Sequence, residues 1–144
     1  MASNQGSVNK SSAAKRVLVV DDSAGMRLYL RTIVTGAGFE CAEATDGAAA
    51  FDLVLRENFD VIVTDLHMPK MDGFELIGAL GLLPAGRKRP AVIVASARLD
   101  EDLVKRRPEL KQATRLLEKP VGVGELLDAI AAALPIRARC ASQR

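Results

Sequence analysis

The sequence predicts an α/β fold in which a doubly wound, five-stranded parallel sheet carries helices on both faces. Two patterns support this prediction. Short runs of β-branched residues alternate along the chain with stretches of helical apolar periodicity. The strongest of these runs are apolar throughout their centres, which is typical of strands covered on both faces. A chain of 144 residues without internal repeats also suits a single domain.

Five strands are expected. The runs RVLVV, DVIVT and AVIVA are almost entirely apolar, so we assign them to buried strands of the sheet. The run FECAEAT alternates more and TRLL gives the weakest pattern, so we assign these two to strands nearer the edges. In chain order the predicted strands cover residues 16–20, 39–45, 60–64, 91–95 and 114–117.

A helical pattern follows each predicted strand, and local signals mark its ends. Ser23 is a candidate N-cap for a helix that closes at Gly36 or Gly38. Asp100 is expected to cap a short helix that ends at Arg107, because Pro108 interrupts it. The other helices are predicted at 48–57 after an Asp46-Gly47 turn, at 74–83 between Asp72-Gly73 and Pro84, and at 125–134 between Gly124 and Pro135.

Charge is distributed unevenly along the chain. All 18 acidic residues lie between Asp21 and Asp128, whereas six of the 20 basic residues lie outside 17–136. The body is therefore mildly acidic, and the basic clusters 87–89 and 105–107 contain no interleaved aromatic residues. We interpret these clusters as solvated helix and loop ends and do not expect nucleic acid as a partner.

The composition also limits location and metal chemistry. No apolar run approaches the ~20 residues of a membrane span, and the N-terminus shows no signal peptide. Cys41 and Cys140 are too few for a disulfide framework or a zinc cluster, and His67 is the only histidine. We expect a cytoplasmic protein without a membrane partner, with its domain at 16–134 and flexible tails at 1–15 and 135–144.

Polar residues follow four of the five predicted strands. Asp21 and Asp22 follow the first, Asp65 the third, Ser96 the fourth and Lys119 the fifth. Ligands of doubly wound sheets bind beyond the carboxyl ends of the strands, so we expect these side chains to converge. Each residue alone has a structural explanation, such as a helix cap or an exposed lysine. Their occurrence together favours a site.

The chemistry of this set points to phosphoryl transfer. Carboxylates 4 Å apart repel by about 1 kcal/mol per pair in water and ~4 kcal/mol in a partly buried site, which a divalent cation relieves. Oxygen ligands favour a hard ion, and Mg²⁺ is the first expectation. Lys119 adds a positive charge and Ser96 a hydroxyl donor. Metal and lysine can balance charge on a phosphoryl group while the central carboxylate attacks it in line.

The segments VLVVDDSAGMR and VIVTDLHMPKMDGFEL, together with Ser96 and the Lys119-Pro120 step, resemble the receiver domain of two-component response regulators, of the CheY-like, single-domain type. The resemblance covers residues 16–134 and is most specific at 65–73. It implies a flavodoxin-like fold with strand order 2-1-3-4-5. It also implies a cis peptide bond before Pro120.

The resemblance implies a metal-binding role for four residues. Asp22 would bind Mg²⁺ directly, and Asp21 would act through a water molecule. Asp65 and the backbone carbonyl of His67 would supply further ligands. Asp65 would also be the phosphoacceptor.

The resemblance implies phosphate-binding roles as well. Ser96 and the backbone of Ala97 would bind the aspartyl phosphate, and Lys119 would pair with it. The side chains of His67 and Arg98 are candidate modulators of the phosphate lifetime.

Several positions depart from the common receiver pattern. Leu116 stands at the switch position, where most receivers carry Tyr or Phe, and Ser96 replaces the more usual threonine. Gln112-Ala113 replaces the usual Gly-Ala before the fifth strand. Because Pro108 lies within the fourth helix of the pattern, that helix is expected to be short or broken.

The function expected from these residues is that of a signalling switch and not of an enzyme. A histidine kinase or a histidine phosphotransfer protein would phosphorylate Asp65, and output would pass to a downstream protein or along a phosphorelay. The alternative is a Mg²⁺-dependent phosphohydrolase with an aspartate nucleophile. Such enzymes usually need a second acid two residues after the nucleophile, where this chain has His67.

Overall fold

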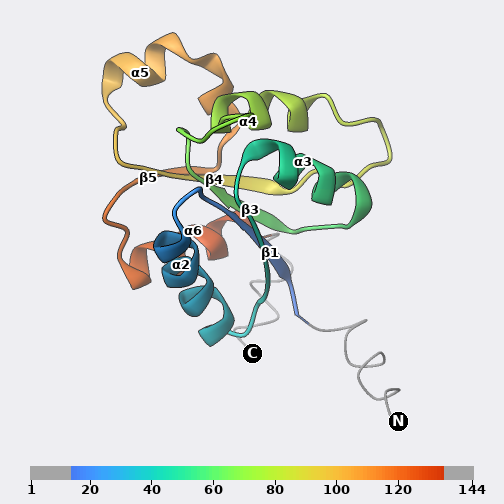
Figure 1. Cartoon of the computed structure of the whole chain (residues 1–144), viewed down its shortest axis with the longest axis vertical. Helices are drawn as coiled ribbons and strands as arrows, with labels where there is room; N and C mark the ends of the chain where they lie inside the picture. Colours follow the sequence, from blue (N-terminus) through green and yellow to red (C-terminus); the bar gives the residue numbers. More distant parts are fainter. Residues whose placement is uncertain (1–13, 135–144) are drawn as a thin grey trace.

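The computed structural model describes residues 14–134 (Figure 1). One sheet contains five parallel strands in the order β2-β1-β3-β4-β5, which confirms the predicted fold class and strand order. The two strands with the less apolar sequences, β2 and β5, are the edge strands. The strands are β1 (Arg16–Val20), β2 (Glu40–Ala44), β3 (Val61–Thr64), β4 (Ala91–Ser96) and β5 (Arg115–Glu118). Apart from Ala14 and Lys15, the predicted tails lie outside the described residues.

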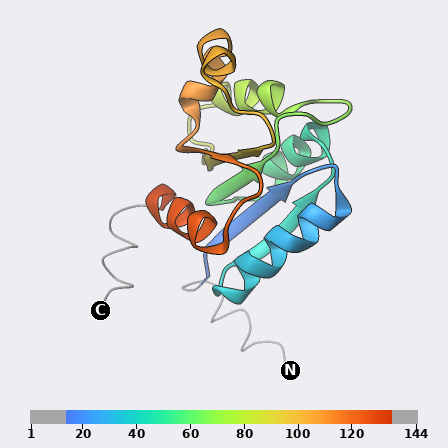
Figure 2. The ribbon, with the colours of Figure 1, turned by 90° about the vertical axis from the view of Figure 1, so that its left-hand side faces the viewer.

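Helices cover both faces of the sheet (Figures 1 and 2). One face carries α2 (Ala24–Gly36) and α6 (Val123–Ala133). The other carries α3 (Gly47–Arg56), α4 (Gly73–Gly81), α5 (Glu101–Arg106) and the 3₁₀ helix η1 (Pro108–Gln112). Among residues 14–134, no helix combines the length and the apolar character needed to cross a membrane.

The alternation of side chains along the central strands produces two separate cores. In β1, Leu18 and Val20 face α3 and α4, whereas Val17 and Val19 face α2 and α6. All four are fully buried, as expected for a strand covered on both faces. The strong apolar runs of the sequence are therefore explained by helices on each side of the sheet.

Side-chain caps begin four of the helices. The Ser23 hydroxyl accepts the amide proton of Met26 at 3.2 Å, as the predicted N-cap requires. Carboxylates of Asp46, Asp72 and Asp100 accept amide protons three residues further on, each at 2.8–2.9 Å. Asp46 is thus a helix cap and not part of the predicted turn, and α3 begins at Gly47.

Other boundaries also differ from prediction. The helix α4 ends at Gly81 and not at residue 83, because the amides of Leu82 and Leu83 bond three residues back to Ala79 and Leu80 in a tightened turn. The helix α6 begins two residues earlier than expected, at Val123. Strand β5 lies one residue later than predicted, and β4 includes Ser96. The chain continues after Arg107 as η1, which the sequence did not predict.

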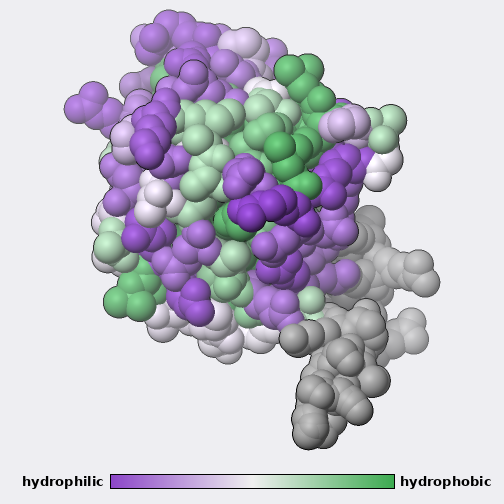
Figure 3. Space-filling view, turned by 45° about the vertical axis from the view of Figure 1, so that its right-hand side comes forward, coloured by the Kyte–Doolittle hydropathy of each residue, from purple (hydrophilic) through white to green (hydrophobic). Residues whose placement is uncertain are grey.

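Most of the surface drawn in Figure 3 is hydrophilic, with one larger apolar area at the upper right and a smaller, separate apolar group at the lower left. Over the described residues, the large apolar side chains that remain exposed are Leu28, Tyr29, Leu55, Leu82 and Val123. Scattered exposure of this kind is ordinary in folded proteins. The apolar residues are otherwise packed in the two cores.

Candidate functional site

The carboxyl ends of β1, β3 and β5 bring acidic and basic side chains together. Carboxylate oxygens of Asp21, Asp22 and Asp65 all lie within 4.8 Å of one another. The Lys119 ammonium lies 2.8 Å from Asp21 Oδ2 and 3.2 Å from Asp65 Oδ2. The convergence predicted from their positions at the strand ends is therefore observed for these four residues, and three hard oxygen donors in one cluster suit Mg²⁺.

Asp21 is the fixed member of the cluster. It is only 1% exposed, and its Oδ1 accepts the amide proton of Ser23 at 2.9 Å. Its backbone carbonyl accepts a hydrogen bond from the Arg27 guanidinium at 2.8 Å. Asp22, by contrast, is exposed. The two neighbouring aspartates therefore differ in environment although they are adjacent in sequence.

Asp65 is held by the backbone that surrounds it. Its Oδ1 accepts the amide proton of Leu66 at 2.7 Å, and the Thr64 hydroxyl donates to the Asp65 carbonyl at 2.8 Å. The loop then returns, so that the Gly73 amide bonds to the Leu66 carbonyl at 2.9 Å. A Cβ atom at Gly73 would lie 2.2 Å from the Asp65 carbonyl oxygen, so this approach requires glycine. Oδ2 of Asp65 remains directed at Lys119.

Lys119 offsets part of the carboxylate repulsion. Burial lowers the pKa of this lysine, but its hydrogen bond to Asp21 and the charge of Asp65 outweigh burial, and the net pKa is raised. Lys119 is therefore a cation throughout the physiological range. It precedes Pro120 through a cis peptide bond, as the resemblance implied.

Ser96 lies at the end of β4, beside Lys119. Its carbonyl accepts the Lys119 amide proton at 2.8 Å, which joins the ends of β4 and β5. The Ser96 side chain is fully buried, and its hydroxyl accepts the Arg98 amide proton at 3.3 Å. Ala97 and Arg98 are exposed at the start of the following loop. In this structure the Ser96 hydroxyl is therefore hydrogen-bonded to the backbone of the loop that follows β4.

The remaining predicted residues are His67 and Leu116. The exposed His67 ring makes an edge-to-face contact with Phe74, with 6.1 Å between the ring centroids. Leu116 is half-buried on β5, opposite Val94 of β4 in the strand register. It faces the core that contains α3 and α4.

Sequence reasoning missed several supporting residues. The Arg27 and Thr64 contacts had no local signal, because each depends on the folded backbone. The Arg107 guanidinium carbon lies 3.6 Å from the centroid of the Phe74 ring, a cation–π contact between the end of α5 and the start of α4. Gly73 had a partial signal, since Asp-Gly commonly marks a turn, but nothing there indicated its contact with Asp65.

Comparison with known proteins places this site in a family. Residues 17–131 match the model of the response regulator receiver domain. Sporulation initiation phosphotransferase F of Bacillus subtilis is 28% identical over 123 residues, which cover 85% of this chain and 96% of that protein.

Solved structures give the same result. The chemotaxis protein CheY4 of Vibrio cholerae superposes with a TM-score of 0.75 at 31% identity, covering 85% of this chain and all of that one. The response regulator protein TrrA of Thermotoga maritima, solved in complex with Mg²⁺ and BeF, has a TM-score of 0.72 at 25% identity, covering 83% of this chain and 99% of that one. The chain belongs to the response regulator receiver domains, which are phosphoacceptor switches of two-component signalling.

Proposed function

We propose that Asp65 accepts a phosphoryl group from a histidine kinase or a histidine phosphotransfer protein. The observation that carries this proposal is the position of its carboxylate, which faces Lys119 at 3.2 Å within the cluster formed with Asp21 and Asp22. A carboxylate so placed can attack phosphorus while a cation stands beside the group being transferred.

The same cluster supports a Mg²⁺ site. Asp22, Asp65 and the backbone carbonyl of His67 would bind the ion directly, and Asp21 would bind it through water. The bound ion would neutralise charge on the phosphoryl oxygens. The carboxylate donor set favours this assignment, as does the Mg²⁺ and BeF complex of the Thermotoga maritima relative.

The protein groups then have separate roles in the transfer. An Oδ atom of Asp65 forms the bond to phosphorus as the bond from phosphorus to the donor imidazole nitrogen breaks, and the imidazole leaves with that electron pair. Lys119 pairs with a phosphoryl oxygen. The Ser96 hydroxyl leaves Arg98 and donates to another phosphoryl oxygen, while the Ala97 amide binds beside it.

Output is proposed to pass to a downstream protein or onward along a phosphorelay, in the cytoplasm. The similarity to a sporulation initiation phosphotransferase supports a relay. We propose no further enzymatic activity beyond promotion of the domain's own phosphorylation and dephosphorylation. The position two residues after Asp65, where phosphohydrolases of similar chemistry carry a second acid, holds His67, whose ring packs against Phe74. His67 and Arg98 remain candidate modulators of phosphate lifetime.

The substitution Asp65→Asn tests the assignment. Incubation with a small phosphodonor such as acetyl phosphate and Mg²⁺ should add one phosphoryl group to the native chain, because one carboxylate is positioned as the nucleophile. Asp65→Asn should lose this labelling completely, as measured by intact-protein mass. Asp102→Asn, which changes an exposed acid on α5, is the matched control and should be labelled normally. Equal labelling of Asp65→Asn would reject Asp65 as the phosphoacceptor.

A further inference from the structure

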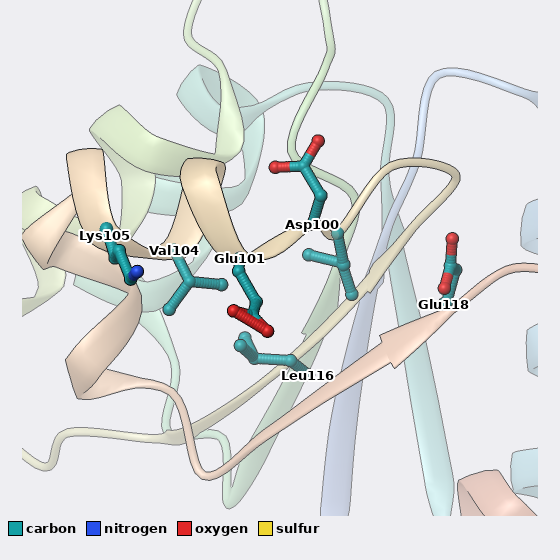
Figure 4. A pocket seen from close by; sticks show the side chains of 7 residues that line it. Asp100, Glu101, Val104, Lys105, Leu116 and Glu118 are labelled. Carbon is teal, nitrogen blue, oxygen red and sulfur yellow. The ribbon is translucent and has the colours of Figure 1, made fainter.

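The helix α5 stands apart from the sheet. Not one of its six residues is buried, and it packs mainly against η1 (Figure 1). Between α5 and the edge strand β5 lies a pocket of about 380 Å³ (Figure 4). Its lining consists of Leu99, Asp100, Glu101, Val104, Lys105, Leu116 and Glu118. The outer edge of β5 is therefore open along this side.

The lining has two chemical parts. Leu99, Val104 and Leu116 supply apolar surface, and Figure 4 shows Val104 and Leu116 directed toward the space between α5 and β5. The charged residues around them are three acids and one lysine, so the pocket carries a net negative charge. A segment that fits such a pocket presents apolar side chains on one side and basic side chains on the other.

The chain beyond α6 has this composition. Ile136, Ala138 and Cys140 alternate with Arg137 and Arg139, and no acidic residue occurs after Asp128. Alternate side chains of an extended segment point to opposite sides, so these five residues can present an apolar side and a basic side. Arg144 adds a third positive charge.

Topology brings this segment within reach of the pocket. The helix α6 follows β5, packs against β4 and β5, and runs back along the opposite face, so it ends on the side of the molecule where β5 begins (Figure 2). Residues 135–141 in an extended conformation span roughly 23 Å. Four residues of strand rise about 13 Å, so the segment is long enough to pass the edge of β5.

We infer that residues 136–144 bind to the pocket between α5 and β5 of the same molecule. Ala138 and Cys140 contact the apolar lining, while Arg137 and Arg139 pair with Glu101 and Glu118. A protein that uses this surface must then displace the segment. The inference does not involve Asp65 and stands apart from the proposed phosphorylation.

A nitroxide label on Cys140 tests the inference in the full chain. The label is attached after Cys41→Ala, which leaves Cys140 as the only thiol. Binding predicts loss of amide signal intensity at Leu99, Val104 and Leu116, relative to the same sample with the nitroxide reduced. The loss should not change on dilution, because the contact is intramolecular. Intensity that recovers on dilution would show binding between molecules and would overturn the inference.

Charge reversals provide the controls. The pair Glu101→Lys and Glu118→Lys should restore the lost intensity, and the pair Asp102→Lys and Asp128→Lys, exposed acids outside the pocket lining, should not. Asp100 is left unchanged because it caps α5. Arg137→Glu with Arg139→Glu changes only the segment and should also restore intensity. Combining Arg137→Glu and Arg139→Glu with Glu101→Lys and Glu118→Lys reverses both sets of charges and should bring the signal loss back. The inference is refuted if the labelled chain shows no signal loss with or without these substitutions.

Discussion

At the scale of single residues, the two adjacent aspartates after β1 are not equivalent. The Asp21 side chain is 2% exposed and pairs with Lys119, so its removal would leave a partly buried lysine with one fewer partner. Asp22 is exposed and lies outside the ion pairs that Lys119 makes. Substitution of Asp22 should therefore separate metal binding from the stability of the fold.

Asp22→Asn should abolish stabilisation by Mg²⁺ without lowering stability in the absence of the ion. The native chain should gain about 2.7 kcal/mol in its free energy of unfolding when Mg²⁺ is at 100 times its Kd. The variant should gain little, because the direct carboxylate ligand is gone. Without metal its stability should be equal or slightly higher, because one of three converging carboxylates is neutral. Thermal unfolding with Mg²⁺ and with EDTA measures both effects, and an unchanged Mg²⁺ response would exclude Asp22 as a ligand.

At the scale of elements, α4 is attached to the phosphoacceptor loop at its first residue. Gly73 begins α4 and touches the backbone of Asp65 and Leu66 so closely that no side chain fits. Gly78 lies in the same helix with nothing within 4 Å of its Cβ position. One helix therefore offers a test glycine and a matched control.

Gly73→Ala should destabilise the domain by about 1–3 kcal/mol, because the added methyl group forces the Asp65 backbone to move. It should also slow phosphorylation by a small phosphodonor. Gly78→Ala should instead stabilise the domain by about 0.5–1 kcal/mol, because alanine has the higher helix propensity. Urea unfolding and labelling rates compare the two variants. Similar behaviour of both would show that the close approach at Gly73 is unimportant.

Asp60 joins the starts of three strands. Its carboxylate accepts the Arg16 amide proton at 2.7 Å and pairs with Lys88 at 2.6 Å, and its carbonyl accepts the Ala91 amide proton at 3.0 Å. Burial raises the pKa of this carboxyl, but the bonds from Lys88 and Arg16 outweigh burial, and the net pKa is lowered.

A lowered pKa in the folded state means that ionised Asp60 stabilises the fold above its unfolded pKa. That contribution is lost as pH falls through the lower, folded value. Asp60→Asn should therefore lower the free energy of unfolding by about 1–3 kcal/mol at pH 7. Below about pH 4 the stability of the variant should fall less steeply with pH than that of the native chain. Asp52→Asn, which breaks an exposed pair with Arg56, should cost about 0.5 kcal/mol or less. Urea unfolding across a range of pH measures the free energy of unfolding of both variants. If stability falls below about pH 4 in Asp60→Asn as steeply as in the native chain, ionised Asp60 does not stabilise the fold.

The elements also show which features the sequence could predict. Ser23, Asp72 and Asp100 mark helix starts through bonds to residues three positions away, so their signals are local. The early end of α4 and the existence of η1 were not predicted, because both are formed by backbone bonds between residues three positions apart, which leave no distinct side-chain signal in the sequence. Convergence of the site residues followed from the topology of parallel sheets, whereas the Arg107–Phe74 contact required the folded positions of α4 and α5.

At the scale of the whole molecule, two cores hold the sheet and α5 belongs fully to neither. Leu103 and Val104 are only partly buried against one core. The Arg107–Phe74 contact connects the end of α5 to α4, and Phe74 in turn touches His67 in the loop after Asp65. A segment with few buried contacts opens at low free energy, so we expect residues 97–112, in which only Leu110 is buried, to move more readily than the strands.

Phosphorylation should therefore change residues 97–112 more than strand β5. The Ser96 hydroxyl must leave Arg98 to reach a phosphoryl oxygen, which releases the start of this segment. Leu116 has no ring or polar tip and can stay packed in both states, so it provides little differential contact energy to drive a shift. Amide chemical shifts with and without a beryllofluoride mimic of the phosphate measure the change.

Arg107→Lys provides a variant for the same measurement, because it keeps the charge but loses the planar group that stacks on Phe74. If this contact carries the change from the loop after Asp65 to α5, the shifts at residues 101–112 should shrink in Arg107→Lys. Those at 97–98 should persist, because they depend on Ser96 directly. The prediction is wrong if the largest changes beyond the site fall at Leu116 and β5 while residues 97–112 stay unchanged.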